Sequence, residues 1–275
     1  MSVPLSSLGQ YNSVPESLLR TTFSPEGLSQ SQRLDRIQQL SERAAGLLLE
    51  NWEDNPAYTH QTMHLGALYA CIPSLEAVAS SAAHSVSIAQ RVTENLQDLS
   101  LYLTSDHFLD IAHQREEDRQ ETIGQLSEIA VLGAMWWGVA NGYRDERSYI
   151  LPATYRENQG RDKDDYWLAT DLVLRRTGSR EKQPIQVKTS DESAITKRKK
   201  ATYHPALAVV AAGSISSPPT KGPVPLLRAF ARNRGIELRK ANEKIDEKLE
   251  AARQSGISYR QSQKAKTRYR PAFAS

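Results

Sequence analysis

Apolar residues recur at intervals of three and four positions over the first third of the chain. Between residues 29 and 53 they are Leu34, Ile37, Leu40, Ala44, Leu47 and Leu48. This spacing places them on one face of an α-helix. Similar patterns predict a second helix over about 56–69 and a third that starts after Pro73 and continues past Leu96 to about Leu103. We therefore expect an all-helical region over 29–115, preceded by a flexible or loosely docked arm over 1–28.

A more apolar helix is expected next, over about 105–141, with a break near Gly124. Its second half, from Ile129 to Ala140, is almost continuously apolar, including Trp136 and Trp137. A run of this kind is typical of a helix buried on all sides. Its 12 residues are too few to cross a bilayer, which requires about 20.

Short apolar segments separated by polar turns follow Gly142. Strands are predicted over 148–152, 166–174, 185–189 and 207–212. The last is apolar throughout, as is typical of a strand at the centre of a sheet. One helix followed by four strands predicts an α/β (α+β) fold with a mixed four- to five-stranded sheet flanked by helices.

Prolines and glycines interrupt the pattern over 213–225. A helix is expected over 224–253, interrupted at Gly235, and the basic tail from Gln254 is expected to be mobile. We therefore expect an α/β core over 116–235 and a basic helix and tail over 236–275.

Charge is unevenly distributed along this 275-residue chain of net charge +3. Residues 180–275 contain 21 Lys and Arg against 8 Asp and Glu, a net +13, whereas residues 1–179 have a net charge of −10. This asymmetry indicates a polyanionic partner for the C-terminal third. A solvated basic surface is the alternative.

Cys71 is the one cysteine, which excludes an intramolecular disulfide and a cysteine-based zinc site. The first residues show neither a basic start nor the continuous apolar run of a signal peptide. We therefore expect a cytoplasmic protein with no membrane partner.

Four polar residues interrupt the apolar elements of the predicted core. Glu128 precedes the apolar helix run, and Asp171 opens the strand sequence Asp-Leu-Val-Leu. In Pro184-Ile-Gln-Val-Lys188, alternation directs Gln186 and Lys188 to one face and the apolar residues to the other. A buried carboxylate is costly unless it is paired or bound to a metal. The pattern therefore indicates a shared polar site.

This ordered set resembles the PD-(D/E)XK nuclease superfamily, which includes restriction endonucleases and repair exonucleases. The family's helix acid matches Glu128, its second-strand acid matches Asp171, and its third-strand motif matches Gln186-Val187-Lys188. Its fourth strand, reached through a second helix, matches 206–212. The resemblance covers roughly 90 of the 275 residues. It implies a restriction-endonuclease-like core.

The resemblance implies a metal-dependent nuclease that hydrolyses phosphodiester bonds, most simply in DNA. Mg²⁺ or Mn²⁺ would be bound by Asp171, Gln186, the main-chain carbonyl of Val187, and Glu128. Lys188 would activate the attacking water and stabilise the charge of the transition state. Among the following residues, phosphate contacts are expected from Thr189, Ser190, Lys197, Arg198, Lys199 and Lys200.

Gln186 departs from the family pattern, which has Asp or Glu at this position. An amide oxygen can coordinate a hard cation but supplies no charge. Two other hypotheses therefore stay open. The chain is a non-catalytic nucleic-acid-binding protein on the same fold, or it is a helical interaction protein, for example a homodimer, built on the long helices at 29–53 and 73–103.

Overall fold

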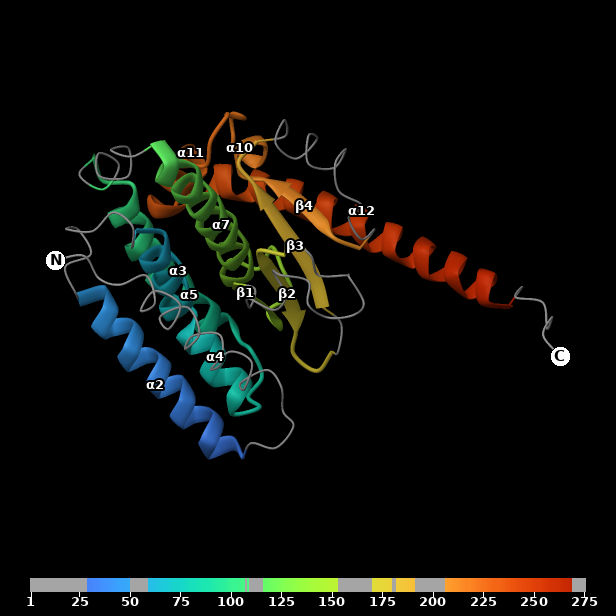
Figure 1. Ribbon diagram of the computed structural model, residues 1–275, viewed down its shortest axis with the longest axis horizontal. Coiled ribbons are helices and arrows are strands. Elements are labelled where there is room, and N and C mark those ends of the chain that lie inside the picture. Colours follow the sequence, from blue (N-terminus) through green and yellow to red (C-terminus); the bar gives the residue numbers. More distant parts are fainter. Residues whose placement is uncertain are drawn as a thin grey trace.

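The computed structural model describes residues 29–49, 59–106, 108, 116–152, 170–179, 182–190 and 206–268. Four helices come first: α2 (Gln30–Leu49), α3 (Thr59–Ala70), α4 (Ile72–Ala79) and α5 (Val86–Leu103). They lie side by side on one side of the long helix α7 (Glu116–Ala140), and the sheet lies on its other side (Figure 1). Within the region predicted to be all-helical, these four helices are described but residues 80–85 are not helical, and the arm over 1–28 lies outside the described residues.

Two helix predictions were wrong in detail. The single helix expected after Pro73 is two helices, because α4 ends at Ala79 and Ser81 adopts a positive φ of 57°. The Ser80 hydroxyl also donates to the carbonyl of Glu76, as expected where a serine competes for helix hydrogen bonds. The break expected near Gly124 is absent, since α7 continues through it.

The sheet has four strands in the order β1 (Ser148–Pro152), β2 (Leu172–Arg176), β3 (Lys182–Lys188) and β4 (Ala208–Ala211). Neighbours β1–β2 and β2–β3 are antiparallel, whereas β3 and β4 are parallel. The predicted mixed α/β fold with a four-stranded mixed sheet is therefore confirmed. The turn between β2 and β3 is shorter than expected, and Gly178 adopts the φ of +79° that favours glycine.

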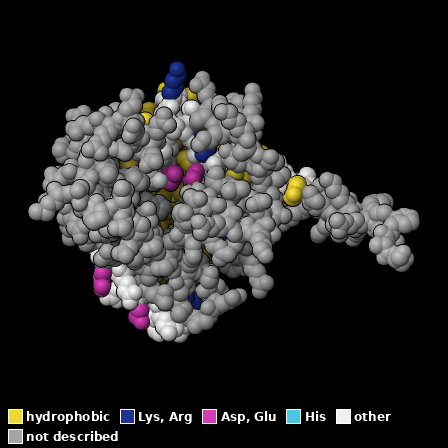
Figure 2. Space-filling model, viewed as in Figure 1, with side chains coloured by type: hydrophobic (Ala, Val, Ile, Leu, Met, Phe, Trp, Pro, Cys, Tyr) yellow, Lys and Arg dark blue, Asp and Glu magenta, His cyan; other side chains and the backbone are white. Residues whose placement is uncertain are grey.

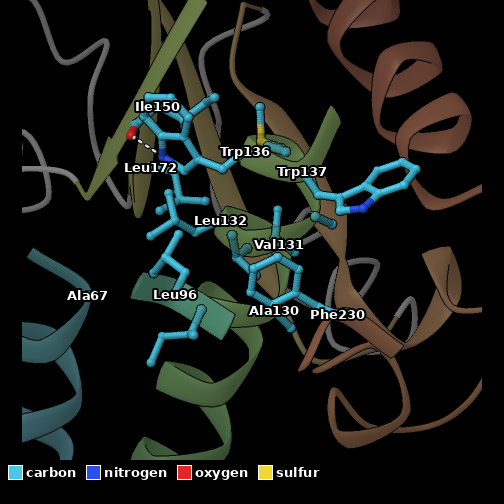
Figure 3. Close-up of a cluster of buried hydrophobic side chains, with 14 of the residues drawn as sticks. Ala67, Leu96, Ala130, Val131, Leu132, Trp136, Trp137, Ile150, Leu172 and Phe230 are labelled. Atoms are coloured by element: carbon cyan, nitrogen blue, oxygen red, sulfur yellow. Dashed lines mark hydrogen bonds between the residues drawn. The ribbon is translucent and has the colours of Figure 1, made fainter. Parts of the chain in front are cut away.

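Helix α7 is the centre of the core. Its residues 129–139 are all buried, and it packs against α3, α5, β1 and β3. Trp136 donates its indole N–H to the carbonyl of Ile150 at 2.9 Å, which fixes the helix to β1 (Figure 3). One hydrophobic cluster extends from Ile37 to Ala252 and joins the helices to the sheet.

Cys71 also belongs to this cluster. It is fully buried, and burial raises the pKa of its thiol to about 12. The thiol is therefore an inert packing group.

Two C-terminal helices, α11 (Val224–Ala231) and α12 (Gly235–Arg268), cover the remaining side of α7. A short helix, α10 (Ala212–Ile215), follows β4 directly. The interruption expected at Gly235 is confirmed. The helix expected to end at Arg253 ends later, because α12 continues to Arg268 and projects from the body of the molecule (Figure 1).

Glycines in α7 allow the C-terminal helices to approach closely. A Cβ on Gly133 would lie 2.5 Å from the Phe230 ring, and one on Gly138 would lie 2.3 Å from Oδ1 of Asn242. The buried amide of Asn242 donates to the carbonyl of Ala134 at 2.7 Å. Its Oδ1 accepts from Nε of Arg144 at 2.7 Å. This contact fixes α12 against α7.

Candidate active site at the end of β3

Asp171 lies one residue before β2, beside the last residues of β3. Its main-chain N–H donates to the carbonyl of Ile185 at 2.9 Å. Its Oδ2 accepts from the main-chain N–H of Val187 at 2.7 Å. The carboxylate thus occupies the place of a main-chain carbonyl at the end of the ladder. The antiparallel register, which pairs Leu172 with Ile185, brings Asp171 beside Gln186.

Glu128 approaches the same place from α7, which packs against β3. Part of its surface stays accessible to solvent. Burial raises its pKa well above the ordinary value, the nearby carboxylate of Asp171 raises it further, and the ammonium of Lys188 lowers it. Glu128 therefore interacts electrostatically with both Asp171 and Lys188. On the face shown in Figure 2, acidic side chains lie beside a Lys or Arg side chain over α7 and the strands.

Gln186 is buried in β3 with 2% of its surface exposed. Its Oε1 accepts no hydrogen bond from the described residues, and the same holds for the buried Oγ1 of Thr170, next to Asp171. A buried polar atom without a partner costs about 1–3 kcal/mol. Asp171 therefore has two residues with an unsatisfied side-chain oxygen beside it. Thr170 precedes it in the sequence, and Gln186 lies opposite it on β3.

The donor set of this place fits a hard cation. Two carboxylates and an unsatisfied amide oxygen are oxygen ligands of the kind that Mg²⁺ and Mn²⁺ prefer. Among the described residues, no group of three His, Cys, Asp or Glu is arranged to hold a metal ion. Such an ion would therefore depend on the amide oxygen and on water for its remaining ligands, as Mg²⁺ commonly does.

Thr189 and Ser190 follow Lys188 at the end of β3, and both are partly exposed. The Thr189 carbonyl accepts from the N–H of Gly213 at 3.0 Å. Its Oγ1 lies 3.4 Å from the hydroxyl of Ser127, the residue before Glu128 on α7. The predicted phosphate-contacting residues Lys197, Arg198, Lys199 and Lys200 lie outside the described residues.

The sequence interpretation missed Thr170, Ser127 and Gly213. Thr170 and Ser127 each precede a predicted site acid, so sequence adjacency was the available signal. Gly213 needs its small size, because a Cβ there would lie 2.3 Å from the carbonyl oxygen of Thr220. From the sequence, Gly213 was predicted only to begin the loop that follows the strand over 207–212.

No helix in the described part of the chain is both long enough and apolar enough to span a membrane. Comparison with protein-family models, curated proteins and solved structures yields no match to this chain.

Proposed function

We propose that this chain is a metal-dependent nuclease that hydrolyses phosphodiester bonds, with DNA as the first substrate to test. The observation that carries the proposal is the geometry at the end of β3, where Oδ2 of Asp171 accepts from the N–H of Val187 and Asp171 lies opposite Gln186, whose buried Oε1 accepts no hydrogen bond from the described residues. The carboxylate of Asp171 also raises the pKa of Glu128. Two carboxylates close enough to raise a pKa repel each other, and a bound cation relieves that repulsion. The order of α7, three antiparallel strands and a fourth strand parallel to β3 agrees with the restriction-endonuclease-like core implied by the resemblance.

In this proposal, Glu128, Asp171, Oε1 of Gln186 and the carbonyl of Val187 would hold Mg²⁺ or Mn²⁺. When bound, such an ion polarises a phosphoryl oxygen and lowers the pKa of a bound water. Asp171 is positioned for this task because the N–H of Val187 fixes one carboxylate oxygen. Lys188 orients the attacking water and stabilises the negative charge that develops on the phosphoryl oxygens. Thr189 and Ser190 would contact the neighbouring phosphate.

The test is cleavage of labelled duplex DNA, single-stranded DNA and RNA by the full chain in EDTA, Mg²⁺ and Mn²⁺. Asp171→Asn and Lys188→Met are each expected to reduce cleavage by at least about 100-fold, because each removes a charge that acts in the transition state. Asp98→Asn and Lys248→Met make the same chemical changes at exposed positions on α5 and α12 and serve as matched controls. Full cleavage by both site variants would refute the proposal.

The second candidate, a non-catalytic nucleic-acid-binding protein, is favoured by Gln186. This residue lowers the negative charge of the site by one relative to the family pattern. The same experiment separates the two candidates. Salt-sensitive binding without cleavage in any divalent ion would support the second.

A further inference from the structure

A long stretch of the chain next to the candidate active site has no acidic residue. Between Glu192 and Glu237 the sequence has no Asp or Glu but eight Lys and Arg. Of these, Lys221, Arg228, Arg232 and Arg234 are described and exposed. The first three carry the inference. None of the three forms an ion pair with a described side chain, whereas Arg234 pairs with Glu237 at 3.2 Å. We call these three residues the α11 cations.

A short series of main-chain contacts connects the α11 cations to the end of β3. The carbonyl of Thr189 accepts from the N–H of Gly213, and the carbonyl of Gly213 accepts from the N–H of Thr220 at 2.8 Å. Lys221 follows Thr220 directly. The loop that carries Lys221 is therefore connected through Gly213 to Thr189, the residue next to Lys188.

Helix α11 continues from this loop. Its buried residues Leu226, Leu227 and Phe230 face the core, and Phe230 contacts Gly133 of α7. Arg228 lies in the last turn of α11, and Arg232 follows the end of the helix. The two residues are four positions apart and both exposed, so their side chains lie on the same side of the helix end. Figure 1 shows α10 and α11 beside each other at the end of the molecule where β4 leads into α10.

We propose that the α11 cations bind the phosphate backbone of a double-stranded nucleic acid whose scissile phosphate lies at the end of β3. This inference rests on the proposed function and extends it to a continuous polymer as the substrate. Lys and Arg contacts with phosphates supply most of the affinity of such complexes. Because these cations lie on a loop and helix beyond the site, they would contact phosphates other than the scissile one.

Other occupants fit this surface less well. The described large apolar side chains that are exposed are Tyr69, Leu101, Tyr102, Tyr143 and Ile236, and none lies between 213 and 234. A protein partner requires an apolar centre, and a membrane-binding helix requires an exposed apolar face. The apolar residues of α11 are instead buried in the core.

The basic residues of α12 offer a contrast. Over 235–250, four Lys and Arg are interspersed with five Asp and Glu, and Arg239 pairs with Glu243. This surface is mixed in charge and provides a matched control. Arg239, Lys240 and Lys248 are exposed, and replacing all three changes the net charge by the same amount as replacing the α11 cations.

The experiment measures binding of the full chain to a labelled 25-base-pair DNA duplex in EDTA, where a metal-dependent reaction does not proceed, over a range of NaCl concentrations. RNA duplex, single-stranded DNA and anionic phosphatidylserine vesicles are further arms. The Lys221→Gln/Arg228→Gln/Arg232→Gln variant is expected to lower the salt slope by about 2–3, because each phosphate that a cation neutralises adds about 0.9 to it. Binding should weaken by about 10- to 100-fold. The Arg239→Gln/Lys240→Gln/Lys248→Gln variant is expected to keep the wild-type slope.

An unchanged slope in the first variant, or an equal decrease in both, would overturn the inference. The inference would also be overturned if the wild-type chain did not bind the duplex, or if the first variant lost binding to vesicles but not to the duplex. The proposed function fails separately: wild-type binding that depends on the α11 cations, without cleavage in Mg²⁺ or Mn²⁺, would keep this surface and reject the nuclease. If the first variant cleaved and bound DNA as the wild type does, the nuclease proposal would stand and the proposal that the α11 cations bind phosphates would be rejected.

Discussion

The main-chain N–H of Val187 donates a 2.7 Å hydrogen bond to Oδ2 of Asp171. One carboxylate oxygen therefore completes the β2–β3 ladder, while the group as a whole interacts with Glu128. Asp171 thus has a structural and an electrostatic role, and substitutions can separate them.

Asp171→Asn keeps an oxygen that accepts from Val187 but removes the charge. We expect its free energy of unfolding in EDTA to stay within about 1 kcal/mol of wild type, because the hydrogen bond is retained. Asp171→Ala should lower the free energy of unfolding by about 1–3 kcal/mol, since a buried N–H is left without a partner. Urea unfolding in EDTA measures both values. Equal stability of the two variants would show that the hydrogen bond contributes little.

Gln186 provides a test of metal binding that is independent of cleavage. Gln186→Glu places a third carboxylate in a position that is 2% exposed. In EDTA this change should lower the free energy of unfolding by about 2–4 kcal/mol, because a buried charge is left unpaired. Added Mn²⁺ should restore most of that stability.

Gln186→Met, of similar size, is the control. It removes the unsatisfied Oε1, so its stability in EDTA should equal or exceed that of wild type. Mn²⁺ should stabilise it less than it stabilises wild type. Thermal unfolding with and without Mn²⁺ gives both comparisons, and identical metal responses in all three proteins would rule out Gln186 as a ligand.

The glycines of α7 allow a matched comparison within one helix. Gly133→Ala and Gly138→Ala should each destabilise the fold by about 2–4 kcal/mol, because the added methyl overlaps Phe230 or Asn242. At Gly124 a Cβ meets nothing within 4 Å. Gly124→Ala should therefore stabilise by about 0.5–1 kcal/mol through helix propensity. Urea unfolding of the three variants tests this order, and a destabilised Gly124→Ala would contradict it.

His84 makes stability depend on pH. Its ring is buried, bonds to Ser74 at 2.8 Å and to Thr177 at 3.2 Å, and stacks on Tyr149. Burial lowers its pKa from 6.5 to about 4, so between these values the unfolded chain binds a proton that the folded chain excludes.

The free energy of unfolding should therefore decrease as the pH falls from about 6.5 to 4, and His84 should account for up to about 3 kcal/mol of the decrease. Below pH 4 the contribution of His84 should change no further. Urea unfolding at pH 7.5 and pH 4.5 measures the decrease. His84→Gln cannot protonate, so the difference between the two pH values should be smaller in that variant. An equal difference in both proteins would assign the acid sensitivity to other groups.

Local patterns predicted the elements well where burial alone determines them. The apolar run before Ala140 predicted a buried helix, and the apolar segment after Leu207 predicted an interior strand, because hydrophobic periodicity is a local property. The separation of α4 from α5 was missed because it depends on the conformation of Ser80 and Ser81 inside an otherwise helical pattern. The continuity of α7 through Gly124 was missed because tertiary packing overrides the weak propensity of one glycine.

The candidate site shows the same division. Its residue types and order are visible in the sequence. The hydrogen bond from Val187 to Asp171 and the contact of Gly213 with Thr220 are not, because both depend on how segments distant in sequence approach each other. The roles of Glu128, Asp171, Gln186 and Lys188 in catalysis stay predictions.

The close approach of α11 and α12 to α7 has a consequence for synthesis of the chain. Asn242 contacts a carbonyl 108 positions earlier, and Gln97 donates to a carbonyl 133 positions later. At about 5–20 residues per second, a ribosome needs roughly 5–20 s to add the segments that cover α7. During that interval the stretch of α7 over 129–139, which is buried in the folded chain, is without its final neighbours, and this makes it a natural binding segment for a chaperone.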